Sequence, residues 1–310
     1  MIDSSRSCEF RSDFHVTTTG TTRMHSVTTF RSIWFLQMLL VALVFGGSSG
    51  AAEPPRKKLI EVGWDIPDTA DLRANWKEME RSAPFDGLHF HAVAISPKRE
   101  RVDSLKLWDA APWEYSWFEK CVEDLQTCRF QKFTDNWLRV DATPGTIEWA
   151  DDDGWKHLAN KLGICSRVAR KGGAKGVCID LEGYGVKSFK FDPDKKMTFA
   201  ETGKLARRRG AEVMRAMATE FPEQILFTHW LNSVNSKSGR IAKPDSVLAT
   251  EVYGLQPAFI NGLLDAMPET MTLVDGCENG CYKDGALDYQ LAAADMRQWH
   301  GPSSRLGRVD

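Results

Sequence analysis

The stretch "AKGVCIDLEGYG", residues 174–185, joins an apolar run to two carboxylates and a sharp glycine turn. Residues 176–179 are small or apolar, which is typical of a strand covered on both faces in a parallel α/β sheet. Because side chains two residues apart in a strand share a face, Asp180 and Glu182 point the same way. Open sheets and barrels place their chemistry at this carboxyl end. The stretch predicts either a site at these two residues or an acidic turn that caps the next helix.

The rest of the chain repeats the alternation of strands and helices. Strands are predicted at 58–65, 85–94, 135–142, 174–185, 224–231, 245–254 and 270–276. Helices are predicted at 69–83, 113–130, 151–173, 198–221, 257–268 and 288–299. Alternating elements imply a parallel sheet, and seven units in about 250 residues fit a (β/α)8 barrel better than an open sheet. Because nothing apolar follows Trp299, we expect a barrel that is incomplete or irregular at its C-terminal end.

The N-terminal part of the chain predicts a leader rather than a folded element. Residues 1–30 are rich in Ser and Thr, and an apolar run at 33–45 follows Arg31 and precedes small residues. This order is typical of a secretory signal, and the run is short for a membrane span of roughly 20 residues. We therefore expect a leader over 1–52, a barrel domain over 53–310 and an exported protein. An uncleaved leader that anchors the protein to a membrane is the alternative.

Charge and cysteine content narrow the classes of function. A net charge of −2 over 310 residues offers no basic field, so no nucleic-acid partner is expected. Six cysteines follow the leader, and in an oxidising compartment they allow one or two disulfides. No pair has the C-x-x-C spacing of a zinc ribbon, and Cys178 is interpreted as a small core residue. No cofactor or bound metal is expected.

Polar and aromatic side chains follow the predicted strands, and a barrel would gather them at one mouth. Pyranose rings stack on indole and present hydroxyls to carboxylates, amides and imidazoles, so the set predicts a carbohydrate ligand. Cleaving a glycosidic bond requires two carboxyl groups, for which we expect Glu182 and Glu278, with Asp180 polarising Glu182. Glu182 is expected to be the acid and Glu278 the nucleophile. The predicted substrate-binding residues are Asp65, His89, His91, Asp141, His229, Trp230 and Asn232.

Three segments carry a resemblance to a known family. The segments are "GVCIDLEGYG" at 176–185, "THW" at 228–230, and "YGLQPAFINGLLDAMPETMTLVDGCENGCY" at 253–282. They resemble a family of secreted bacterial proteins that is similar to retaining glycoside hydrolases with a (β/α)8 barrel. In that superfamily the acid/base follows strand four and the nucleophile follows strand seven, which the resemblance carries to Glu182 and Glu278. Strand four ends here in Asp-Leu-Glu instead of the common Asn-Glu pair.

Two other classes of function remain open at the level of sequence. One is a carbohydrate-binding barrel that has lost catalysis. The other is a metal-dependent hydrolase that uses His89, His91 and His229, because an H-x-H strand with a further histidine is a metal-site pattern in barrel hydrolases.

Overall fold

The computed structural model describes residues 56–63, 65–235, 243–297 and 304–305. The chain divides into two units, Met1–Lys57 and Lys58–Asp310, and the architecture given below is that of the second. The predicted leader over 1–52 lies outside the described residues. Among the helices that the structure does describe, none has both the length and the apolar character needed to cross a bilayer.

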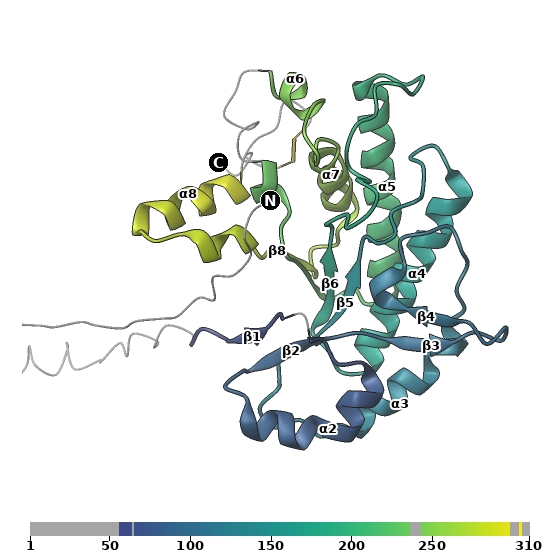
Figure 1. Ribbon diagram of the computed structural model, residues 1–310, viewed down its shortest axis with the longest axis vertical. Coiled ribbons are helices and arrows are strands. Elements are labelled where there is room, and N and C mark those ends of the chain that lie inside the picture. The colour runs from purple at the N-terminus through teal and green to yellow at the C-terminus, as the bar shows by residue number, and fades with distance from the viewer. Residues whose placement is uncertain (1–55, 64, 236–242, 298–303, 306–310) are drawn as a thin grey trace, which may run out of the picture. The chain divides into compact units, whose positions relative to one another are not determined.

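A curled sheet of six parallel strands forms a half-barrel at the centre of the second unit (Figure 1). The strands lie in the order β1-β2-β5-β6-β7-β8, and every neighbouring pair is parallel. Their bounds are Ile60–Glu61 (β1), Gly87–Phe90 (β2), Trp137–Asp141 (β5), Gly176–Asp180 (β6), Ile225–Thr228 (β7) and Thr272–Asp275 (β8). An antiparallel hairpin of β3 (Val93–Ile95) and β4 (Arg101–Asp103) follows β2.

Helices connect successive strands and cover the outer face of the half-barrel. Figure 1 shows α4, α5 and α7 together on one side of the sheet, where α5 packs against both of the others. The helices are α2 (Thr69–Ser82), α3 (Glu119–Thr127), α4 (Asp152–Lys171), α5 (Phe199–Glu220), α6 (Pro244–Leu248), α7 (Gln256–Ala266) and α8 (Ala286–Met296). The buried outer-face residues of the sheet belong to one apolar core with residues of α2, α3, α4, α5 and α7; they are Leu138, Val140, Val177, Ile179 and Leu226.

Local sequence explains where the longest helices begin. Asp151 precedes α4 and its carboxylate accepts a hydrogen bond from the Gly154 amide at 2.9 Å. Thr198 and Glu201 form a reciprocal capping box at the start of α5. Such caps satisfy amide donors that the first helical turn leaves unpaired. The two helices therefore start where a polar capping residue precedes a segment with apolar residues at helical spacing.

The predicted strand at 245–254 is wrong. This segment forms α6 and a series of turns, with the Gly254 amide donating to the Glu251 carbonyl oxygen at 3.2 Å. Pro244 occupies the first helical turn, where its fixed φ favours a helix. Each of the other six predicted strands contains an observed one. The described residues thus hold an open α/β half-barrel, compatible with the incomplete barrel that we expected, and not eight strand–helix units.

Candidate functional site

The inner face of the half-barrel is polar, in contrast to its apolar outer face. Strand β5 alternates Trp137, Arg139 and Asp141 with the core residues Leu138 and Val140, because strand side chains alternate between faces. In the parallel register Arg139 lies beside Cys178 of β6, and Asp141 lies beside Asp180. The period of two therefore brings charged groups from neighbouring strands into one buried layer.

Arg139 bridges two carboxylates within this layer. Its Nε donates to Asp141 Oδ1 at 2.8 Å and its Nη2 donates to Asp180 Oδ2 at 2.8 Å. The Arg139 side chain is 4% exposed, so all three charges are held away from bulk water. Burial raises the pKa of Asp141 to about 6, although the guanidinium opposes this shift. The cluster is therefore a buried ion triad at the carboxyl end of β5 and β6.

Glu182 follows β6 and Glu278 follows β8, and β7 lies between these two strands in the sheet. The Glu182 amide donates to Asp180 Oδ1 at 2.9 Å, which turns the chain just after β6. The Glu278 amide donates to the His229 carbonyl oxygen at 3.0 Å, which holds the segment after β8 against the end of β7. Burial raises the pKa of Glu278, and the carboxylates of Asp180 and Glu182 raise it further. The three carboxyl groups are thus close enough to interact electrostatically.

A second group of side chains lies deeper on the inner face. His89 of β2 is fully buried, and neither ring nitrogen has a hydrogen-bond partner in the described part of the chain. Its ring stacks on that of His229, with centroids 5.9 Å apart and planes 16° apart. Burial lowers the pKa of His89 to about 3, so the ring is neutral at neutral pH. One ligand atom each of His89, Cys178 and His229 lies within 4.8 Å of the other two.

Four predicted site residues lie outside both groups. His91 follows the last residue of β2, and its Nδ1 pairs with Asp103 Oδ1 at 2.9 Å instead of facing His89. Asn232 donates to the carbonyl oxygens of Asp295 and Met296 at 3.2 and 3.3 Å, at the end of α8. The two others are less enclosed: Asp65 is exposed after β1, and half-buried Trp230 contacts the Tyr253 ring edge-on at 6.0 Å.

Two residues of the site were not among the predicted site residues. Arg139 is central to the ion triad, and Cys178 was interpreted as part of the core. The signal for both was present in the strands, because Arg139 is two residues from Asp141 and Cys178 is two residues from Asp180.

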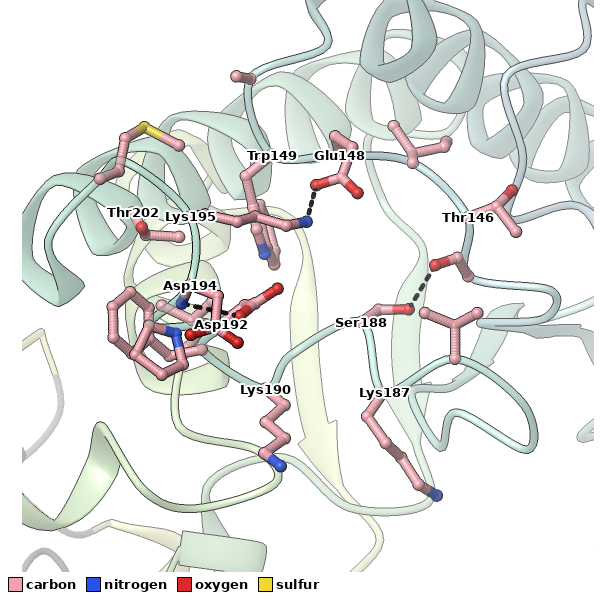
Figure 2. A pocket seen from close by; sticks show the side chains of 18 residues that line it. Thr146, Glu148, Trp149, Lys187, Ser188, Lys190, Asp192, Asp194, Lys195 and Thr202 are labelled. Atoms are coloured by element: carbon pink, nitrogen blue, oxygen red, sulfur yellow. Dashed lines mark hydrogen bonds and ion pairs between the residues drawn. The ribbon is translucent and has the colours of Figure 1, made fainter.

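A pocket of about 1020 Å³ lies between the loops that follow β5 and β6 (Figure 2). Lys195 pairs with Glu148 across it, and Ser188 Oγ donates to the Gly145 carbonyl oxygen at 3.2 Å. None of the predicted site residues lines this pocket.

No protein-family model matches this chain, and comparison with curated proteins and with solved structures gave no significant match. Because fold alone does not specify function, the function is inferred from the side chains of the site and their geometry.

Proposed function

We propose that the protein is a secreted glycoside hydrolase whose chemistry uses carboxyl groups at the carboxyl edge of the half-barrel. The observation that carries this proposal is the placement of Asp180 and Glu182 at the end of β6 and of Glu278 after β8, where the Glu278 amide is hydrogen-bonded at the end of β7. Glycoside hydrolysis requires a carboxylic acid that protonates the leaving oxygen and a carboxylate that acts as nucleophile or base. Neighbouring carboxyl groups that raise one another's pKa supply this division of roles.

The environment of each carboxyl group suggests its role. Glu278 has a raised pKa, which favours Glu278 as the proton donor and leaves Glu182 as the nucleophile or base. This assignment is the reverse of the one expected from the sequence. Asp180 accepts hydrogen bonds from Arg139 and from the Tyr184 hydroxyl, the latter at 3.0 Å, so it orients the site instead of reacting.

The surroundings of the carboxyl groups are also suited to a sugar. Trp230 and Tyr253 form an aromatic pair, and burial, reinforced by the carboxylates of Glu182, Asp180 and Glu278, raises the pKa of Tyr253 to about 12. An aromatic side chain beside the acids is the arrangement in which a pyranose C–H face stacks while its hydroxyls bind carboxylates. The pocket between the loops after β5 and β6 would hold further sugar units.

The proposal is tested by the release of reducing sugar from a panel of polysaccharides. We expect the Glu182→Gln and Glu278→Gln variants to lose activity by about 10²–10⁴-fold, because each removes an acid or a carboxylate of the reaction. Glu223→Gln is the matched control, because Glu223 is exposed just before β7, at the opposite end of the strand. The control should keep wild-type activity.

Two results would contradict hydrolysis. Unchanged activity in both site variants would remove the carboxyl groups from the mechanism. Binding of an oligosaccharide without turnover by the wild-type protein would instead favour the carbohydrate-binding barrel. If the enzyme is active, NMR of the first product shows whether the anomeric configuration is retained or inverted. Retention implies that the two carboxyl groups lie about 5–5.5 Å apart, and inversion implies about 6.5–9.5 Å.

A further inference from the structure

Three side chains from three strands converge beneath the carboxylate site. His89 comes from β2, Cys178 from β6 and His229 from the residue after β7, and their exposed fractions are 0%, 0% and 7%. One nitrogen or sulfur atom of each lies within 4.8 Å of the other two. The three residues lie far apart in the sequence, so only the sheet order brings them together.

Three of the four ring nitrogens of this cluster are buried without a hydrogen-bond partner in the part of the chain that the structure describes. Both ring nitrogens of His89 and the Nε2 atom of His229 are buried and unpaired within the described residues. Burying a polar group without a compensating bond costs about 1–3 kcal/mol by mutational measures, so native structures pair such groups or use them. Unpaired ring nitrogens of two histidines whose ligand atoms lie near a buried thiol therefore point to a shared ligand.

We propose that His89, Cys178 and His229 bind one transition-metal ion, with Zn²⁺ as the expected occupant. Two imidazole nitrogens and one thiolate form a donor set of borderline softness, which suits zinc and disfavours magnesium or calcium. Tetrahedral bonds of about 2.0–2.1 Å to nitrogen and about 2.3 Å to sulfur separate ligand atoms by about 3.3–3.6 Å. The three ligand atoms lie within 4.8 Å of one another, so metal binding requires them to approach by up to about 1.2–1.5 Å.

Asp180 supports this assignment from outside the cluster. Its Oδ2 lies 3.6 Å from His229 Nδ1, which leaves the unpaired Nε2 of His229 for the metal. Histidines that bind metals commonly donate their other ring N–H to a carboxylate, which fixes the tautomer and the ring orientation. Three protein ligands leave a fourth position for water, as in catalytic zinc sites. The site differs from the one expected from the H-x-H pattern, because Cys178 takes the place of His91.

The experiment uses the full chain, stripped with a chelator and then titrated with Zn²⁺ or Co²⁺. We expect one ion per chain by elemental analysis, and X-ray absorption of the zinc-loaded protein should show one sulfur at about 2.3 Å and nitrogens at about 2.0–2.1 Å. Cys178→Ser and His89→Gln should weaken binding at least tenfold. The matched controls Cys165→Ser and His91→Gln, whose side chains are also buried but lie outside the cluster, should bind as the wild type does.

The spectroscopic arm does not depend on variants, so a variant that fails to fold leaves the proposal testable. A wild-type chain that takes up no zinc, a first coordination shell without sulfur, or unchanged affinity in a folded Cys178→Ser variant would overturn it. These readouts measure metal uptake and not sugar release, so they are independent of the outcome for the proposed hydrolase.

Discussion

Replacing Arg139 by Met tests whether the inner face of the half-barrel depends on its buried ion triad. Met keeps most of the length of the side chain but removes the guanidinium that donates to Asp141 and Asp180, each at 2.8 Å. The two carboxylates would then lie side by side in a buried layer without a cation. Removing one partner of a buried ion pair costs about 3–5 kcal/mol, so we expect a loss of that size in the free energy of unfolding near pH 7.

The pH dependence of this loss gives the sharper test. The pKa of Asp141 is already raised to about 6 by burial, and losing the guanidinium raises it further. A carboxyl group whose pKa is higher in the folded than in the unfolded protein binds more protons when folded, so stability increases as the pH falls through the folded-state pKa. At about 1.4 kcal/mol per pKa unit, the gap between wild type and variant should shrink by at least about 1 kcal/mol from near pH 7 to near pH 5.

Urea unfolding of metal-free protein, followed by tryptophan fluorescence, measures both quantities. Arg209→Met is the matched control, because Arg209 is also buried but its carboxylate partners Asp152 and Glu212 have side chains 72% and 32% exposed. The control leaves no buried carboxylate behind, so its loss should be smaller and should not change between the two pH values. A loss for Arg139→Met below about 1 kcal/mol, or one that is constant with pH, would refute the buried triad.

Two further predictions concern the packing of the helices. Gly210→Ala in α5 should destabilise the fold by at least about 2 kcal/mol in a thermal melt, because the added Cβ would lie 2.1 Å from the Phe259 carbonyl oxygen. Gly203→Ala in the same helix is the control: its Cβ would meet nothing closer than 3.9 Å, so this variant should be as stable as the wild type or more stable. Lys161→Met should cost about 2–5 kcal/mol in urea unfolding, because the fully buried ammonium donates to two carbonyl oxygens at 2.8 Å, while exposed Lys156→Met should change little.

The alternation of strands and helices could be predicted because each element carries its own local signal. The prediction of a strand at 245–254 was wrong because the apolar residues of this segment fit a short helix as well as a strand. Pro244, directly before the segment, favours the helix. The prediction that His91 shares a face with His89 was wrong for a related reason. Residues two apart share a face only within a strand, and β2 ends at Phe90. Local periodicity thus predicts the type of an element better than its end.

The composition of the inner face could be predicted only in part. The alternation of Arg139 and Asp141 in β5 is visible in the sequence, but in β6 the same alternation is hidden, because Cys178 counts as apolar. Which side chains meet across strands depends on the order β2-β5-β6-β7, and that order is set by how the helices pack on the outer face. The His89–Cys178–His229 cluster is therefore a property of the topology that no spacing within one segment reveals.

Asp180 belongs to both proposed sites, which determines the variants that can tell them apart. Its Oδ2 accepts hydrogen bonds from Arg139 and Tyr184 and faces His229 Nδ1 at 3.6 Å, while its Oδ1 holds the Glu182 amide. A change at Asp180 would disturb the ion triad, the orientation of the metal-binding imidazole and the turn that positions Glu182 together. Loss of activity in an Asp180 variant would therefore not distinguish the two proposed sites. Variants of Glu278 test the hydrolase site alone, and variants of Cys178 test the metal site alone, because neither side chain belongs to the ion triad.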